Sequence, residues 1–288
     1  MKRIILLALL IAFSNMYSQK IEKKIGTCKI TKVGYSFGNG NEKRKISKSE
    51  FYFNDFGKIL EKITYGRHHY NKLNVIGKIE QFNYDKDKLE LSKNYTSSCK
   101  SCDYYKFYTK YNYDKNNVLI NENTYYGQND SLFMSINYVD KPNIKETHFS
   151  ESTFYQKIYD SENRIIQLNQ IFEDTKKIRW QYLYEYIDSC KIGNFQTYYG
   201  DGKENSKREI ECFDLQKRII SKEIIAGYKT KILYSYSKEG LLKEIKEYES
   251  FSDKEYKLKY ILKFKIKGKT AKLNEEILRK INTELIGE

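Results

Sequence analysis

Proline is almost missing from this chain of 288 residues, which contains only Pro142. The sequence also has no H-E-x-x-H and no phosphate-binding glycine loop. The short motifs typical of zinc proteases and nucleotide-binding folds are therefore excluded. The apolar share of 40% depends on 28 Tyr and 15 Phe, and aromatic residues together with many isoleucines favour strands. The composition predicts an all-β core beneath a charged surface.

Residues 1–18 have the pattern of a signal peptide. Lys2 and Arg3 precede an apolar run over residues 4–13, which is too short to span a bilayer but suits a signal-peptide core. We expect cleavage near Ser18, without a lipid anchor, because no cysteine follows the run. No later segment is apolar enough to be a transmembrane segment. The sequence therefore predicts an exported bacterial protein that is periplasmic, on the cell surface or secreted.

The charge balance is strongly basic, with a formal net charge of +14. Such a surplus can attract anionic glycans, lipid headgroups or an acidic protein. Only eight of the 52 basic residues are Arg, and the lysines are spread along the chain. A solvated lysine surface is thus favoured over a dedicated polyanion site. Aromatic and basic residues also alternate on nucleic-acid platforms, but export argues against a nucleic-acid partner.

One short frame recurs along the chain at intervals of 21 to 31 residues. It consists of an aromatic residue, Asp or a similar residue, two variable positions, Asn or Gly, one further position and an aliphatic residue. The copies are FNDFGKI at Phe53, YDKDKL at Tyr84, YDKNNVL at Tyr113, YVDKPNI at Tyr138, YDSENRI at Tyr159, YIDSCKI at Tyr186, FDLQKRI at Phe213 and YSKEGLL at Tyr236. Repetition at this period indicates a repeat architecture.

The physical chemistry of the frame predicts a turn between two strands. Asn or Asp at the first position of the turn, directly after the aromatic residue, can accept a backbone hydrogen bond. Gly or Asn at the fourth position of the turn tolerates positive φ. The predicted turn residues are Asn54, Gly57, Asp85, Asp114, Asn117, Asp160, Asn163, Asp214 and Gly240. An alternative is that Tyr159 and Asp160 form an acid–base pair. A catalytic pair would occur once, whereas this one recurs wherever the chain reverses.

The frame resembles the tyrosine-aspartate repeat of the RHS family, on YDSENRI, YDKNNVL, FNDFGKI and YSKEGLL. FNDFGKILEKITY and YYGDGKENSKREI also look like the repeats of MORN-type antitoxin proteins. Both resemblances imply serial antiparallel hairpins over residues 51–270, forming a long twisted sheet or open solenoid. Large RHS proteins enclose a toxin in such a sheet. Eight units are too few for that role, so we do not extend it to this chain.

The two ends of the array differ from its repeats. Residues 19–50 are expected to supply N-terminal strands. Leu273, Ile277, Ile281 and Leu285 lie four residues apart and predict a C-terminal capping α-helix within residues 271–288. Repeat arrays need their last apolar face covered, which favours a cap over a partner-binding helix.

Cysteine spacing suggests a disulfide more than a reactive site. Cys99 and Cys102 form CKSC, whose neighbours show no helical pattern of the thioredoxin type. In an exported chain a loop disulfide or inert thiols are the favoured interpretation, with metal binding and redox activity as alternatives. Cys190 and Cys212 lie near adjacent turns and can also pair, which leaves Cys28 unpaired. No cofactor or metal is expected.

Histidine and tryptophan give weaker signals. His68 and His69 are interpreted as solvent-exposed loop residues. A metal shared by both is disfavoured, because adjacent strand positions point to opposite faces. Trp180 opens the aromatic run in KIRWQYLYEY. Its ring can stack on a sugar, but cross-strand packing is the favoured interpretation.

Taken together, these patterns predict an exported, non-enzymatic repeat protein. Its Tyr- and Lys-rich β surface would bind a protein or an anionic glycan or envelope component. One alternative is an immunity protein that neutralises a toxin, as the antitoxin-like repeats imply. A second alternative is a carbohydrate-active enzyme.

Overall fold

The computed structural model describes residues 28–37, 42–66, 75–85, 88–96, 106–127, 129–149, 152–199, 202–250, 255–268 and 273–287. The signal peptide expected at residues 1–18, the histidines His68 and His69, and the possible disulfide between Cys99 and Cys102 lie outside these residues. Within the described part of the chain, strands dominate and one helix, α2 (Glu275–Ile286), follows them.

The strands follow one another along the chain. They are β1 (Cys28–Phe37), β2 (Lys43–Phe53), β3 (Ile59–Gly66), β4 (Val75–Asp85), β5 (Lys88–Thr96), β6 (Lys106–Tyr113), β7 (Leu119–Tyr126), β8 (Leu132–Lys141), β9 (Ile144–Phe149), β10 (Thr153–Tyr159), β11 (Ile165–Phe172), β12 (Ile178–Ile187), β13 (Cys190–Tyr199), β14 (Gly202–Phe213), β15 (Ile219–Ile225), β16 (Lys229–Tyr236), β17 (Leu242–Ser250) and β18 (Lys257–Gly268).

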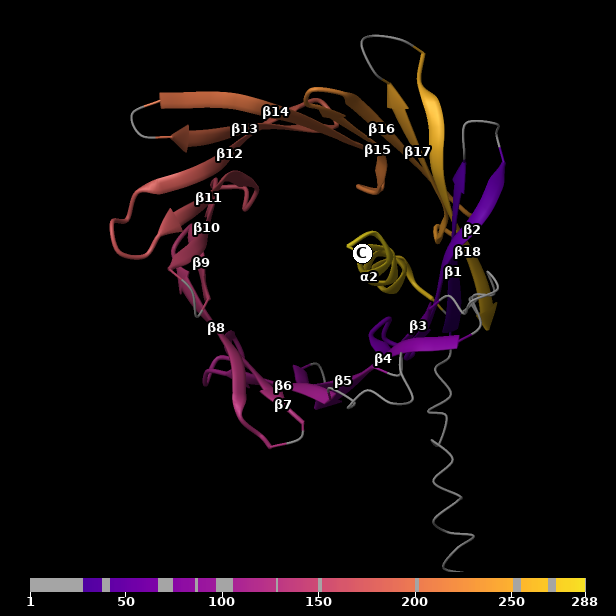
Figure 1. Ribbon diagram of the computed structural model, residues 1–288, viewed down its shortest axis with the longest axis horizontal. Coiled ribbons are helices and arrows are strands. Elements are labelled where there is room, and N and C mark those ends of the chain that lie inside the picture. Colours follow the sequence, from indigo (N-terminus) through magenta and orange to yellow (C-terminus); the bar gives the residue numbers. More distant parts are fainter. Residues whose placement is uncertain are drawn as a thin grey trace, which may run out of the picture.

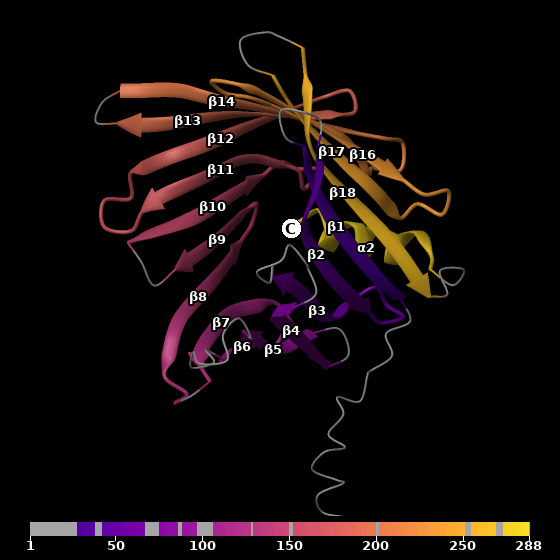
Figure 2. The same cartoon turned by 45° about the vertical axis from the view of Figure 1, so that its right-hand side comes forward.

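These strands form a closed antiparallel barrel. Each pairs with the next, and β1 pairs with β2 on one side and with β18 on the other (Figure 1). The described residues thus contribute 18 strands to one sheet, which run obliquely around the wall (Figure 2). The all-β prediction with serial hairpins is confirmed, but the open sheet or solenoid is wrong. Pairing β1 with β18 satisfies the backbone groups that two free edges would expose.

The recurring frame occupies one end of the barrel. Five connections at this end, which we call the corner rim, each contain a four-residue turn: β2–β3, β6–β7, β10–β11, β14–β15 and β16–β17. Their fourth residues all have positive φ: Gly57, Asn117, Asn163, Lys217 and Gly240. The connections that follow odd-numbered strands, such as β3–β4, lie at the opposite end, the loop rim. The repeated frame therefore coincides with every second reversal of the chain.

Side-chain acceptors shape four of the corner turns. The Oδ1 atom of Asn54 accepts hydrogen bonds from the backbone N–H groups of Phe56 and Lys58, at 3.0 and 2.9 Å. Asp114, Asp160 and Asp214 accept the equivalent pairs of bonds. This geometry fixes the turn from within, as expected for Asx turns. It also holds Lys217 at a φ of 59° without the help of Gly or Asn.

The copies that depart from the frame make shorter turns. Asn143, with a φ of 60°, lies between β8 and β9, and Asp188, with a φ of 51°, lies between β12 and β13. Asp85 ends β4 and pairs with Lys88, the first residue of β5. A two-residue hairpin needs positive φ at its centre, which Asn143 and Asp188 supply in two of these copies.

Helix α2 lies inside the barrel against β1, β2 and β18 (Figure 1). Asn274 caps it by accepting a hydrogen bond from the N–H of Ile277. Ile281 and Leu285 are fully buried in a core that includes Phe51 and Phe53. The helix thus covers inward-facing apolar residues rather than the end of an open array. Among the described residues, no helix is long and apolar enough to cross a membrane.

Candidate ligand-binding wall inside the barrel

The inner face of the barrel can be followed strand by strand from helix α2. Phe51 contacts α2 and lies opposite Lys62, which therefore also faces inward. Because directly paired residues share a face, the register carries this assignment around the closed sheet. It places Trp180 inward whether it is followed from β2 or from β18.

Four aromatic residues at alternate positions of β12 face inward. They form what we call the aromatic row: Trp180, Tyr182, Tyr184 and Tyr186. The ring centroids of Trp180 and Tyr182 lie 6.0 Å apart, and those of Tyr182 and Tyr184 lie 5.8 Å apart. The row runs from the loop rim to the corner rim, and β12 lies across the barrel from α2 (Figure 1).

Water reaches this inner wall. All members of the aromatic row are half-buried rather than buried, and inward-facing Lys157 is exposed. Inward-facing Tyr260 is 39% exposed. A barrel of 18 strands is too wide for its own side chains to fill. The aromatic row is therefore a surface and not a packed core.

More rings from neighbouring strands extend the aromatic row sideways. Phe195 lies 4.8 Å from Tyr182 and 5.6 Å from Trp180, measured between ring centroids. Tyr155 lies 5.6 Å from Trp180 on the other side. Gly193 is opposite Tyr184, and a Cβ atom added there would lie 2.8 Å from Cε1 of Tyr184. The absence of a side chain at Gly193 thus lets the Tyr184 ring lie against the sheet.

Beside the aromatic row, β13, β14 and β15 carry a network of alternating charges. Lys222 bridges Glu209 at 2.8 Å and Glu211 at 3.0 Å, and Lys191 contacts Glu211 at 3.1 Å. Lys207 pairs with Glu209. These charges neutralise one another and position the rings, since Lys191 lies 4.5 Å from the centroid of Tyr184.

Burial and ion pairing set the protonation states of this wall. Burial raises the pKa of Tyr182, Tyr184 and Tyr186, so the phenols keep their protons. Burial alone would also raise the pKa of Glu209, but hydrogen bonds from Lys207 and Lys222 outweigh it and lower that pKa. The wall therefore offers hydroxyl donors and paired charges.

A recess of about 370 Å³ lies at the loop-rim end of the aromatic row. It is lined by Tyr155, Gln170, Arg179, Trp180, Thr197 and Tyr198. Gln170 is 9% exposed, and its amide donates toward Thr153 at 3.4 Å and Tyr155 at 3.5 Å. The recess combines ring faces, amide and hydroxyl groups and one guanidinium, a set that binds small polar ligands.

A larger recess of about 730 Å³ lies at the corner rim between α2 and two turns. Four basic and three acidic side chains line it: Lys217, Arg218, Lys238, Arg279, Glu239, Glu275 and Glu276. Arg218 is already engaged there, with its Nε donating to Asp214 at 2.7 Å. This mixed set selects no single ligand charge.

The outer wall is polar, and its charges are paired. Outward-facing Glu50 contacts Lys29 at 2.7 Å and Lys48 at 3.0 Å. Farther round, an amide ladder crosses β10 to β13, with Asn169 bonded to Gln156 and Gln181 bonded to Gln196. Because these groups satisfy one another, they are not open to a ligand.

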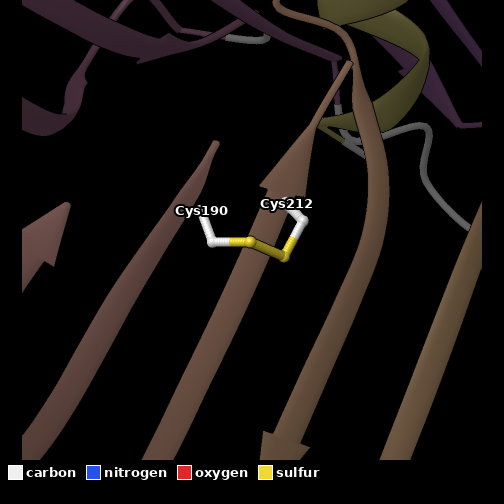
Figure 3. The surroundings of a disulfide bond; sticks show 2 residues. All are labelled: Cys190 and Cys212. Carbon is white, nitrogen blue, oxygen red and sulfur yellow. A yellow bond between two sulfur atoms is a disulfide. The ribbon is translucent and has the colours of Figure 1, made fainter. Parts of the chain in front are cut away.

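Cys190 and Cys212 form a disulfide across β13 and β14 (Figure 3). Their Cα atoms are 4.1 Å apart on the outward face. The pairing suggested by the sequence is thus present, and Cys28 is a buried free thiol. The bond joins two strands that carry Phe195, Gly193 and the charged network on their inner side.

The structure does not gather the predicted turn residues into one site. They are spread around the corner rim, away from the recess, and four of them accept hydrogen bonds within their own turns: Asn54, Asp114, Asp160 and Asp214. Trp180 is the residue singled out from the sequence that lies in the recess. The alternation of Trp180, Tyr182, Tyr184 and Tyr186 was a visible signal of one aromatic strand face. Among the described residues, no cluster of potential metal ligands occurs.

Comparisons with known proteins identify no relative by sequence. No protein-family model matches the chain, and no curated protein matches it.

Three solved structures show a distant likeness. A porin-like protein from Bacteroides uniformis is 6% identical, with a TM-score of 0.40, and the match covers 83% of this chain and 97% of that one. A Tc holotoxin pore from Photorhabdus luminescens is 10% identical, with a TM-score of 0.29, covering 80% of this chain and 14% of that one. A protein of unknown function from Bacteroides fragilis is 9% identical, with a TM-score of 0.17, covering 61% of this chain and 92% of that one. Since every score is below 0.5, these likenesses carry no argument.

Proposed function

We propose that this chain is an exported, non-enzymatic binding protein whose inner wall receives a glycan. The observation that carries the proposal is the aromatic row of Trp180, Tyr182, Tyr184 and Tyr186, which is accessible to water inside a closed barrel. Aromatic faces beside hydroxyl and amide groups suit sugars, because one side of a sugar ring is apolar and its rim is polar.

The lysines beside the aromatic row favour a binding role over a catalytic one. The carboxylates next to the row, Glu209 and Glu211, are held by lysines and have lowered pKa values, although burial acts in the opposite direction. A general acid needs a raised pKa instead. This arrangement favours binding over glycoside hydrolysis.

The outer wall fits an aqueous compartment. Lys29, Glu50 and Lys48 lie side by side on its surface, and charged groups of this kind are costly against lipid. Together with the leader-like residues 1–18, this supports work in water outside the cytoplasm.

Trp180 is the single tryptophan of the chain, so its fluorescence reports directly on the inner wall. The test titrates the mature protein with neutral and acidic oligosaccharides and follows both fluorescence and heat of binding. We expect saturable binding that protects Trp180 from an aqueous quencher, with no release of shorter sugars. Binding unchanged in a Tyr182→Ala, Tyr184→Ala double variant that remains folded would contradict the proposal. Cleavage of the glycan would favour the enzyme alternative.

A further inference from the structure

The recess at the loop-rim end of the aromatic row has features that define a narrower ligand class. It presents the rings of Trp180 and Tyr155 together with the polar groups of Gln170 and Thr197. Its volume of about 370 Å³ is in the range of small-ligand sites and suits one or two sugar units.

Charge distinguishes the recess from the rest of the inner wall. Arg179 lines the recess and is exposed, and none of the six lining residues is acidic. Farther along the aromatic row, each lysine beside the rings is paired with a glutamate. The recess thus holds a guanidinium that can pair with a carboxylate, as planar guanidinium groups do well.

The aromatic surroundings set the shape of the ligand. Trp180 packs at tilted angles of 42° and 50° against Tyr155 and Phe195, which braces its ring. A braced ring binds with little loss of side-chain entropy. The structure also keeps Arg179 near aromatic surface, with its Cζ 6.0 Å from the ring centroid of Phe172.

We propose that this recess binds a carboxylated sugar unit, with the sugar ring stacked on Trp180 and its carboxylate paired with Arg179. Gln170 and Thr197 then bond the hydroxyl groups of the ring. The rest of the chain of sugars extends along the aromatic row toward Tyr186. This inference rests on the proposed glycan-binding function and specifies its ligand.

The experiment compares oligosaccharides of galacturonic acid and of galactose with equal length, by calorimetry on the full mature protein. We expect the acidic series to bind at least tenfold more tightly at low salt, with the difference shrinking as salt is added. Arg179→Gln should remove this preference, so that the acidic series binds no more tightly than the neutral series. Arg208→Gln, a change at an exposed arginine that faces outward on β14, is the matched control and should preserve the preference.

The outcomes separate the two proposals. Equal affinity for both series, or an unchanged preference in Arg179→Gln, would overturn the carboxylate inference while leaving glycan binding in place. Loss of the preference in Arg208→Gln as well would assign it to overall charge and also overturn the inference. Absence of binding to either series would overturn both. Trp180→Phe, which keeps an aromatic ring, should weaken both series to a similar extent if the ring stacks on the sugar.

Discussion

Ile30 lies opposite Ile266 where β1 pairs with β18, at the junction that closes the barrel. Ile30 is fully buried, and Ile266 packs against the same core. The contact joins the first and last strands, so every other hairpin is held in a ring by this pairing. Closure therefore depends on residues that lie at opposite ends of the sequence.

Ile30→Ala should destabilise the protein by about 2–5 kcal/mol, because a fully buried side chain is lost at the closing junction. Thermal and urea unfolding followed by circular dichroism measure the change. Ile187→Ala is the control, since Ile187 is 52% exposed, and it should change stability by less than about 0.5 kcal/mol. Equal effects of both changes would argue against closure through β1 and β18.

Gly57→Ala should cost more stability than Gly240→Ala. Both glycines have positive φ, 75° and 87°, where a side chain costs about 1–2 kcal/mol. Only Gly57 faces the backbone of α2, since a Cβ there would lie 3.0 Å from the carbonyl oxygen of Ile277. Gly227→Ala is the control, with no atom within 4 Å of the added Cβ. A larger loss at Gly240 in urea unfolding would contradict this packing of α2.

Asp214→Ala should destabilise the protein by about 0.5–1.5 kcal/mol, and Asp214→Asn by less. The Oδ1 atom of Asp214 accepts hydrogen bonds from the N–H groups of Gln216 and Arg218, and an Asn oxygen can accept the same two. The paired changes at Asp160 should rank in the same order, since its turn has the same bonds. Unfolding midpoints provide the measurement. A glycan-cleaving activity abolished by Asp160→Asn alone would instead identify a catalytic carboxylate.

The local parts of this fold were readable from sequence because short-range chemistry determines them. An Asn or Asp that accepts two backbone hydrogen bonds and a Gly at positive φ define a turn within four residues, as at Asn54–Gly57. The helix was likewise visible in the spacing of Ile277, Ile281 and Leu285. Kinship with the tyrosine-aspartate or MORN-type repeats remains a prediction.

The long-range parts of the fold could not be predicted from the sequence. Whether β1 meets β18 depends on the twist and tilt accumulated over all intervening strands, and no local pattern expresses that sum. The recess is non-local in the same way, because it draws Tyr155, Gln170, Trp180 and Thr197 from four strands. The positive φ of Lys217 could not be predicted either, because it follows from the turn that Asp214 shapes and not from the residue type of Lys217 itself.

Reducing or removing the Cys190–Cys212 disulfide should lower stability without unfolding the barrel. The bond closes a loop with a sequence separation of 22, for which the chain-entropy argument gives about 3 kcal/mol. The double variant Cys190→Ser, Cys212→Ser should therefore unfold at lower urea concentration than the oxidised protein. Reductant should shift the midpoint of the native protein but not that of the variant. A reductant effect that persists in the variant would assign it to other cysteines.

Glu50 should make the protein less stable in acid. Burial favours the protonated acid, but hydrogen bonds from Lys29, Lys48 and Tyr65 outweigh it and lower the pKa of Glu50 from 4.5 to about 2. The folded state therefore binds this proton less readily than the unfolded state does. The stability that Glu50 contributes is fully present above pH 4.5 and is lost as the pH falls toward 2.

Glu50→Gln tests this linkage when its unfolding free energy is compared with that of the unchanged protein across pH 2 to 7. At neutral pH the variant should be less stable by on the order of 2–3 kcal/mol, and the difference should shrink below pH 4.5. Other carboxylates lose stability in the same range, so the difference between the two curves carries the information and not either curve alone. Glu185→Gln is the matched control, because Glu185 is exposed on the outward face of β12, and its curve should parallel that of the unchanged protein. A gap between the Glu50→Gln and unchanged curves that stays constant over the whole range would show that Glu50 contributes shape and not charge to the outer wall.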